Sequence, residues 1–482
     1  MNEIREQLRQ LNKEQLIDII LEMRGQIEEL KAVVKTQSER IQRLEDRLAQ
    51  NSQNSSKPPS SDGLKKKPAP KSLREKGKRK TGGQKGHKGA TLKMVSEPDH
   101  IEVHHVRTCS NCQADLSHVE VTEIEKRQVF DVPPIEIEVT EHQAEIKCCS
   151  TCGKRVKADF PEGLNATVQY GNRLKAQAVY LNSYQLLPLA RICELFGDFY
   201  NHSPSESLIL NGNSALVEAI EPTLEAIQAQ IKRADTVHCD ESGMRVEGKL
   251  NWLHVLATER LTYYAVHRKR GQEAMRDIGL LGDLQGYAIH DGWASYFKFE
   301  TCLHALCNAH HLRELRFIFE QYQQTWASDM FSLLLDIKKD IEAISSEQTS
   351  LEPERLLYYE EQYDQLLREG FEANPLPEQP PPQKRGRTKQ SKAKNLLDRL
   401  QKYKAETLAF MSDFRVPFDN NLAERAVRMI KVKQKISGTF RTRLGAETFC
   451  DIRSYISTAR KQGQNVIQVI YEALLGRPFI PT

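Results

Sequence analysis

Residues 236–267 read TVHCDESGMRVEGKLNWLHVLATERLTYYAVH, and this stretch decides the fold of the central part of the chain. Apolar and polar side chains alternate along three runs, 236–246, 250–258 and 261–267, and only EGK and ER separate them. Period-two runs with such short connections predict an antiparallel meander of three strands. Asp240 stands in the middle of the first run.

The sequence that follows the meander predicts that the same sheet continues with further strands and becomes a mixed sheet. GQEAMRDIGLL predicts a helix, GYAIHD a short strand ending in Asp291, and CLHALC another strand before the helix of NAHHLRELRFIFE. This order is that of a ribonuclease-H-like mixed α/β core, in which Asp240 and Asp291 would lie on neighbouring strands. A charge-rich helical insertion then separates them from a third acid.

The third acid is Glu424, in the stretch PFDNNLAERAVRMIKVKQ (417–434). Asp419, Asn420 and Asn421 are cap candidates, and the helix after them has an apolar face opposite Glu424. Three carboxylates can hold two Mg²⁺ ions, which would activate a hydroxyl nucleophile in phosphodiester displacement. The structural alternative is that Asp240 caps a strand end and that Glu424 pairs with Arg428 one helical turn away.

Residues 1–50 carry a heptad repeat. Ile20, Ile27, Val34, Ile41 and Leu48 fall at a, and Leu16, Met23, Leu30, Gln37 and Leu44 fall at d. β-Branched residues at a with Leu at d favour a parallel two-stranded coiled coil, so this segment predicts self-association through a leucine zipper. The alternative is an amphipathic helix packed on its own globular domain.

A basic segment poor in apolar side chains follows the heptads. Twelve Lys and Arg stand against two acids between residues 57 and 88, although the whole chain has a net charge of only +4. This composition predicts a disordered linker over 51–95, either a solvated tether or an arm that contacts DNA phosphates. The arm would use Lys65, Lys66, Lys67, Lys78, Arg79 and Lys80.

Two C-x-x-C pairs predict a zinc-binding β-hairpin module over 96–158. Alternating residues at 122–133 and 135–147 predict two long antiparallel strands that would bring the pairs together around a structural Zn²⁺. The ligands would be Cys109, Cys112, Cys149 and Cys152. Cys148 is an alternative to Cys149, and His104, His105 and His142 are reserve ligands.

Two further segments leave alternatives open. Residues 159–234 predict a helix, a polar turn and a longer helix, which fits a helix-turn-helix DNA reader and an ordinary helical connector equally well. A second zinc site could be formed by Cys302, His304, Cys307, His310 and His311. We favour core packing for these cysteines, because free Cys is among the most buried residue types.

Length and composition exclude several classes of protein. The chain has 482 residues, of which 39% are hydrophobic, and no apolar run approaches the roughly 18 residues of a membrane span. The N-terminus lacks the apolar core of a signal peptide. We therefore expect a cytoplasmic α+β protein of several domains whose paired cysteines bind metal.

Several motifs together resemble bacterial transposases of the insertion-sequence-66 family. They are the zipper, SSKPPSSDG, GGQKGHKG, the paired cysteines, DES at 240–242, HDGWASY at 290–296, CNAHHLREL at 307–315, and PFDNNLAERAVRMIKVKQKISGTFRT at 417–442. The resemblance implies a DDE transposase that binds element ends and catalyses metal-dependent strand cleavage and transfer. It implies that Asp240, Asp291 and Glu424 are catalytic and hold Mg²⁺ or Mn²⁺. A non-catalytic DNA-binding protein derived from a transposase is the alternative.

The resemblance also implies partners, which are double-stranded DNA at the element ends and at the target, and small helper proteins from the same element. A DNA partner in turn implies a location at the nucleoid. Phosphate contacts near the third acid would come from Arg425, Arg428, Lys431, Lys433, Lys435, Arg441 and Arg443. The expected segments are the coiled coil 1–50, linker 51–95, zinc module 96–158, helical domain 159–234, first core part 235–320, helical insertion 321–415, catalytic helix 416–440 and helical tail 441–482.

Overall fold

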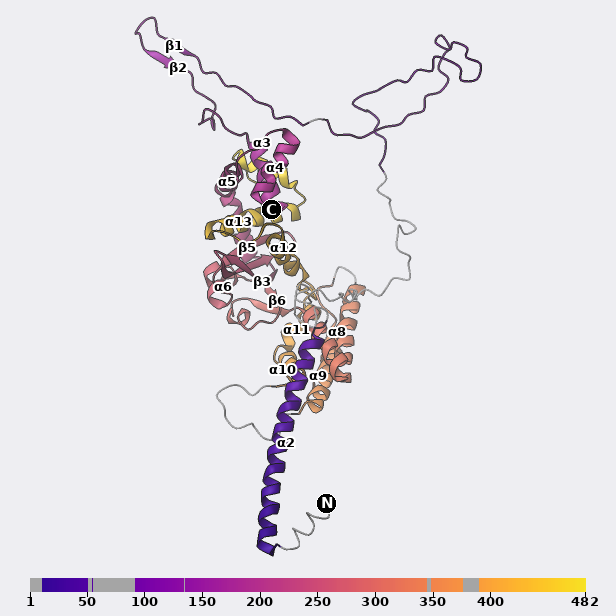
Figure 1. Cartoon of the computed structure of the whole chain (residues 1–482), viewed down its shortest axis with the longest axis vertical. Coiled ribbons are helices and arrows are strands. Elements are labelled where there is room, and N and C mark those ends of the chain that lie inside the picture. Colours follow the sequence, from indigo (N-terminus) through magenta and orange to yellow (C-terminus); the bar gives the residue numbers. More distant parts are fainter. Residues whose placement is uncertain (1–10, 51–53, 55–91, 134, 345–347, 376–389) are drawn as a thin grey trace. The chain divides into compact units, whose positions relative to one another are not determined.

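The computed structural model describes residues 11–50, 54, 92–133, 135–344, 348–375 and 390–482 (Figure 1). The chain divides into two compact units. One comprises Met1–Pro68, Pro161–Leu195 and Pro204–Thr482, and the other Ala69–Phe160 with Phe196–Ser203. Most of the predicted basic linker, including its six candidate DNA contacts from Lys65 to Lys80, lies outside the described residues.

A five-stranded mixed sheet forms the centre of the larger unit. Its strands are β3 (Thr236–Val246), β4 (Lys249–Ala257), β5 (Thr262–His267), β6 (Tyr287–His290) and β7 (Leu303–Leu306). They lie in the order β5-β4-β3-β6-β7. The first three are antiparallel, and β6 and β7 run parallel to β3. The predicted antiparallel meander and the mixed sheet are therefore confirmed, and the strands added to the meander are parallel to β3.

Helices cover both faces of this sheet. On one face, Met244 and Val246 of β3 pack with α12 (Asn421–Ser437). On the other, Val237 and Cys239 pack with α5 (Glu206–Lys232). Because side chains alternate along a strand, Asp240 belongs to the face of α12 and Glu241 to the opposite face. The short helices α6 (Gln272–Ile278), η3 (Leu281–Asp283) and η4 (Tyr296–Lys298) connect β5 to β6 and β6 to β7.

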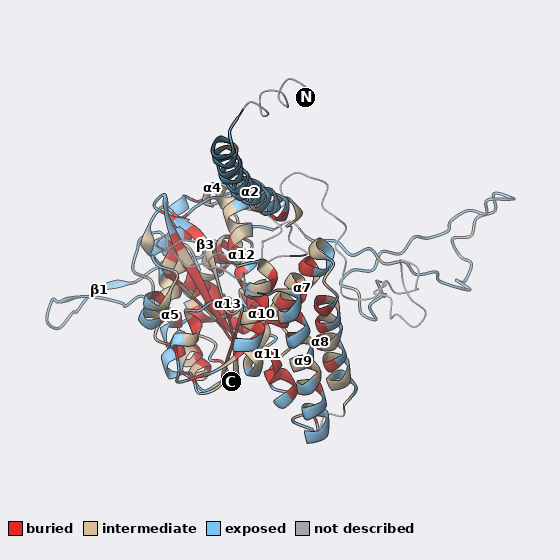
Figure 2. Cartoon of the chain, turned by 90° about the horizontal axis from the view of Figure 1, so that it is seen from below, coloured by how far each residue is buried: buried red, intermediate tan, exposed pale blue. Residues whose placement is uncertain are grey.

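The predicted helical insertion is present as a lobe whose apolar core also includes Ile289 of β6 and Ala305 of β7. It contains α7 (Asn308–Tyr322), α8 (Thr325–Ala343), α9 (Pro353–Ala373), α10 (Lys392–Lys402) and α11 (Lys404–Ser412). Tyr363 is completely buried at its centre and donates its hydroxyl to the carbonyl of Leu400, 3.0 Å away. Buried residues line the facing sides of these helices in Figure 2. This lobe lies between the second and third acids in the sequence, and it ends just before the segment that leads into α12.

The helical segment before the sheet belongs to the same packed body as the C-terminal tail. It contains α3 (Asn172–Val179), the π-helix η2 (Tyr180–Tyr184) and α5, while the tail contains α13 (Arg443–Lys461) and α14 (Val466–Leu474). The helix α4 (Leu189–Tyr200) is divided, because its residues from Phe196 on are assigned to the smaller unit. Leu216 and Ile220 of α5 share one core with Ile452 of α13 and Ile470 of α14. The α5 helix is thus a core element, which favours the connector interpretation for it.

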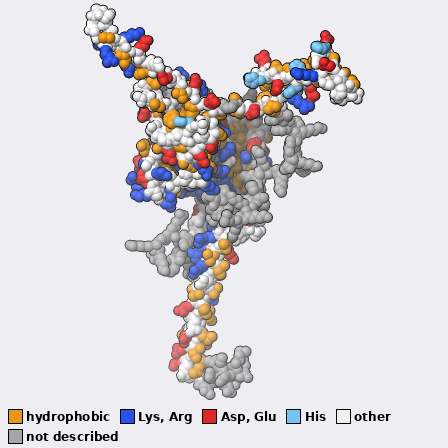
Figure 3. Space-filling view, turned by 45° about the horizontal axis from the view of Figure 1, so that its top comes forward, with side chains coloured by type: hydrophobic (Ala, Val, Ile, Leu, Met, Phe, Trp, Pro, Cys, Tyr) orange, Lys and Arg blue, Asp and Glu red, His pale blue; other side chains and the backbone are white. Residues whose placement is uncertain are grey.

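The heptad segment is a single long helix, α2 (Lys13–Ala49), which begins with a capping box between Asn12 and Gln15. Figure 2 shows it exposed along almost its whole length, and Figure 3 shows hydrophobic side chains along it. Its contact with the helical lobe is near its C-terminal end, where Tyr322 donates to Asp46 over 2.7 Å. Among the described residues, no helix has the length and apolarity of a membrane span.

The prediction of a long hairpin in the zinc module is wrong. Residues 119–133 and 135–145 contain no strand. In the part of this unit that the structure describes, the strands are the short pair β1 (Ile146–Cys148) and β2 (Arg155–Lys157). The apolar residues of the alternating stretches are exposed; Val129 is 91% and Val139 88% accessible. Alternation stabilises a strand only where one face is covered, and an isolated two-stranded hairpin is marginal in water.

Candidate active site

Asp240 and Asp291 occupy matching positions on neighbouring parallel strands. His238 of β3 pairs with Ile289 of β6, and each aspartate lies two residues beyond its member of that pair. The same register continues into β7. His290 pairs with Leu306, so Cys307 directly follows β7 in the same way that Asp291 directly follows β6. Two carboxylates and a thiol therefore lie at the same level of the sheet, at the ends of β6 and β7 and beside them in the middle of β3.

Asp240 is a half-buried carboxyl with acidic neighbours. Burial raises its pKa to about 8, together with the negative charges of Glu241, Asp291 and Glu424, although the Glu241 amide donates to it over 2.8 Å and opposes the rise. An apolar setting disfavours the ionised form, and a cation at the site would favour it again. The side chain thus has the environment of a group that ionises when a cation binds.

The turn after β6 holds Asp291 through backbone and histidine contacts. The Trp293 amide donates to Asp291 over 2.9 Å, and the Gly292 amide donates to His290 Nδ1 over 3.0 Å. Gly292 has a φ of +88°, which a side chain would strain. Burial lowers the pKa of His290 to about 3, so it is neutral, and its Nε2 faces Nδ1 of His304 at 3.2 Å.

Glu424 stands in the first turn of α12, and Asn420 fixes the start of that helix. The Asn420 amide group donates to the Cys239 carbonyl over 2.7 Å, and its oxygen lies 2.9 Å from His238 Nδ1. Its backbone N–H donates to the Cys307 sulfur over 3.1 Å. Asn420 is the N-cap residue of α12, as its place among the cap candidates predicted, but its side chain makes no capping hydrogen bond. It is 1% exposed and links the start of α12 to β3 and to Cys307.

The Glu424 carboxylate is nearly buried and partly unpaired. Its Oε2 lies 3.3 Å from Arg428 and 3.7 Å from Arg313, while its side chain is 13% exposed. Its Oε1 lies 3.7 Å from Nδ1 of His310 and has no hydrogen-bond partner. The predicted interaction with Arg428 is thus present. In the described part of the chain, Glu424 gathers with Cys307 and His310 within 4.8 Å, whereas the three acids do not form a set that tight.

Glu241, next to Asp240, has partners of its own on the opposite face of the sheet. Its carboxylate, 2% exposed, binds Arg270 at 2.5 Å and accepts the Tyr296 hydroxyl at 2.5 Å. The Arg270 guanidinium lies over the rings of Trp252 and Trp293, at 5.0 and 4.2 Å from their centroids. Sequence reasoning missed this cluster and the role of Asn420; the signal available for the cluster was the strand alternation that sends Glu241 away from Asp240.

The seven cations proposed near the third acid divide into two groups. Three of them are engaged within the protein: Lys431 donates to the Gly243 carbonyl over 2.6 Å, Lys433 lies 3.8 Å from the Phe440 ring centroid, and Arg443 binds Glu447 at 2.6 Å. The other four have exposed side chains, which is the state that phosphate contacts require, although one of them, Arg428, also pairs with Glu424. They are Arg425, Arg428, Lys435 and Arg441.

The two cysteine pairs form turns of the same construction. The Cys109 amide donates to Ala114 and Gln113 donates back to Cys109; likewise Cys149 donates to Lys154 and Gly153 donates back. Gln113 and Gly153 both have positive φ, +64° and +70°. Amide N–H groups lower the pKa of Cys109 and bring that of Cys149 to about 7. Each turn therefore suits a thiolate ligand, although the four sulfurs do not come together in the described residues.

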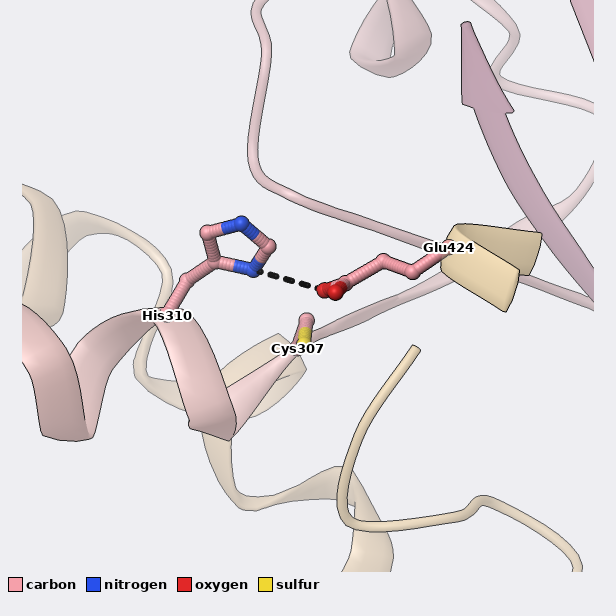
Figure 4. Close-up of side chains that lie close together, drawn as sticks. All are labelled: Cys307, His310 and Glu424. Atoms are coloured by element: carbon pink, nitrogen blue, oxygen red, sulfur yellow. Dashed lines mark ion pairs between the residues drawn. The ribbon is translucent and has the colours of Figure 1, made fainter. Parts of the chain in front are cut away.

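The second cysteine and histidine cluster is not a single site. Cys302 and His304 lie together at 3.9 Å, and His311 is buried against Asn308 at 3.1 Å. Cys302 is also part of an apolar core, as predicted. Cys307 and His310 instead face Glu424 (Figure 4).

Comparisons with known families define the class of protein. The model described as the zinc-finger binding domain of transposase IS66 matches residues 107–153, which supports a zinc-finger domain with a structural Zn²⁺. The model of the transposase IS66 family matches residues 167–448, more than half of the chain. The chain belongs to the IS66 transposase family, which confirms the resemblance noted above. A family of unknown function (DUF6444) matches residues 2–93, and no curated protein matches.

Proposed function

We propose that this transposase binds the ends of its element and cuts and joins DNA strands with a DDE set formed by Asp240, Asp291 and Glu424. The observation that carries the proposal is the equivalent placement of the two aspartates on β3 and β6, with Asn420 linking the start of α12 to β3 and to Cys307. The strand order β5-β4-β3-β6-β7 supports the ribonuclease-H-like assignment of the core.

The residues suit divalent metal ions that prefer oxygen ligands. Burial and negative neighbours raise the pKa of Asp240 to about 8, and the buried Oε1 of Glu424 lacks a partner; a cation would relieve both conditions. Asp240, Asp291 and Glu424 would hold Mg²⁺ or Mn²⁺. Such ions supply a deprotonated nucleophile and stabilise the leaving oxygen in phosphodiester displacement.

The remaining groups of the site position DNA and the acids. The exposed side chains of Arg425, Arg428, Lys435 and Arg441 would contact phosphates, which fixes the register of the duplex without reading its sequence. Asn420 holds the first turn of α12 against the sheet, and the Asn308 amide donates to Phe418 over 3.0 Å just before it. Water or a terminal 3′-hydroxyl would be the nucleophile, so no covalent link between protein and DNA is needed.

Two further modules complete the proposal. Cys109, Cys112, Cys149 and Cys152 would hold the structural Zn²⁺ of the zinc-finger domain, because four thiolates form a closed tetrahedral site. The exposed a and d positions of α2, such as Ile27 (47%) and Leu30 (62%), would pair with a second copy of the helix. A dimer of this kind would bring together two catalytic domains, one for each end of the element, with helper proteins of the element joining the assembly.

The experiment that tests the proposed function is cleavage of linear DNA carrying the ends of the element. We expect the purified full-length chain to nick this DNA in Mg²⁺ or Mn²⁺, to fail in EDTA, and to leave shuffled DNA of equal length intact. Binding to the ends without cleavage would favour the non-catalytic DNA-binding alternative. Equal cutting of both DNAs would indicate a structure-selective nuclease of the same fold.

A further inference from the structure

Cys307, His310 and Glu424 form a compact group of unlike metal ligands. Cys307 directly follows β7, His310 lies in the first turn of α7, and Glu424 lies in the first turn of α12. Figure 4 shows the three side chains converging from these elements. A sulfur, an imidazole nitrogen and a carboxylate oxygen of the three lie within 4.8 Å of one another.

The group contains two buried polar atoms that lack hydrogen-bond partners within the described structure. They are His310 Nδ1 and Glu424 Oε1, and they face each other at 3.7 Å. That distance is too long for a hydrogen bond. Two ligands at about 2.1 Å from a tetrahedral Zn²⁺ lie about 3.4 Å apart, so the gap is close to that between ligands of one ion.

The neighbouring residues leave the side of the group with His310 Nδ1 and Glu424 Oε1 available to a cation. Arg313 and Arg428 approach the other oxygen of Glu424, Oε2, at 3.7 and 3.3 Å. The Cys307 sulfur accepts the Asn420 N–H over 3.1 Å, and an N–H donor of this kind stabilises a thiolate ligand. The Asn308 side chain, between Cys307 and His310, donates to the Thr407 carbonyl over 2.9 Å and fixes the start of α7.

We propose that Cys307, His310 and Glu424 bind one thiophilic divalent cation of the Zn²⁺ type, at a site distinct from the zinc finger. Thiolate and imidazole ligands select such ions, whereas Mg²⁺ takes oxygen ligands. Three protein ligands leave a fourth position open for water or another ligand. Glu424 also belongs to the proposed catalytic set, but cation binding here depends neither on DNA nor on cleavage.

The test is a Co²⁺ titration of the full-length chain in which the four zinc-finger cysteines are replaced by serine. We expect one equivalent of Co²⁺ to produce the near-ultraviolet absorption of a thiolate–cobalt bond. Adding Cys307→Ala should abolish the absorption, and adding His310→Ala should weaken Co²⁺ binding at least about tenfold. Cys450→Ala, which removes a buried thiol elsewhere in the core, should leave the absorption unchanged.

A second measurement avoids the serine substitutions. After equilibration with buffered Zn²⁺, the otherwise unaltered chain should retain one more equivalent of zinc than its Cys307→Ala variant and the same amount as Cys450→Ala. Equal zinc content in the parent chain and Cys307→Ala would overturn the proposal, as would a cobalt–thiolate absorption that persists without Cys307. Neither result depends on cleavage, so a failure of the proposed function would remain distinguishable.

Discussion

Asp291→Asn is expected to slow Mg²⁺-dependent cleavage of element-end DNA by at least about 10³-fold while changing DNA affinity by less than about threefold. Asparagine keeps the size of the side chain and an oxygen for the Trp293 amide, but it removes the negative charge that would hold the metal. Loss of about 4 kcal/mol of transition-state stabilisation corresponds to this factor. Single-turnover cleavage and filter binding on the same DNA measure the two quantities.

The matched control for this substitution is Asp283→Asn. Asp283 is an exposed acid in η3 that pairs with Lys232 at 2.7 Å, outside the candidate site. Its replacement should leave the cleavage rate within about twofold of the parent, because loss of an exposed ion pair has little effect. If Asp291→Asn cleaved as fast as Asp283→Asn, Asp291 would not be a metal ligand.

Replacing two a positions of α2, Ile27→Asp and Val34→Asp, is expected to weaken self-association of the full-length chain by at least about 10³-fold. Each substitution removes an apolar layer from both helices of a dimer, and burial of one such side chain contributes about 1.5–3 kcal/mol. Sedimentation equilibrium at micromolar protein concentrations measures the change.

Val33→Asp is the matched control, because Val33 is similarly exposed (54%, against 61% for Val34) but lies at a g position beside the seam. We expect this variant to lose less than tenfold in association. A parent chain that sediments as a monomer would exclude the zipper, and so would a loss in the Val33→Asp variant equal to that in the Ile27→Asp/Val34→Asp variant.

Local sequence patterns predicted the parts of the fold that local interactions determine. The meander of residues 236–267 and the helix that carries Glu424 followed from hydrophobic periodicity, since each buries one continuous face. The prediction of a hairpin in the zinc module was wrong for the same physical reason. Apolar and polar residues alternate there as they do in strands, but apolar residues such as Val129 and Val139 have no other surface to pack against and stay exposed.

The site required contacts between residues far apart in the sequence. Asn420 was expected as a cap candidate, yet its side chain bonds to His238 and Cys239, 182 and 181 positions earlier. Similarly, Lys431 was predicted to face DNA, but its amine reaches the Gly243 carbonyl of β3. Neither periodicity nor residue type indicates such pairings, because they depend on how α12 lies on the sheet.

The central claim is that Asp291 and Glu424, far apart in the sequence, bind the same metal ions. The most direct test compares the cleavage rate of the double variant Asp291→Asn/Glu424→Gln with the rate of each single variant. When catalytic residues act as one unit, replacing one of them slows the reaction about as much as replacing all of them. We predict a loss of about 10³-fold for each single variant and about the same loss for the pair, with DNA binding retained. A Glu424→Gln chain that cleaves at the parental rate, or losses that multiply in the double variant, would contradict the account.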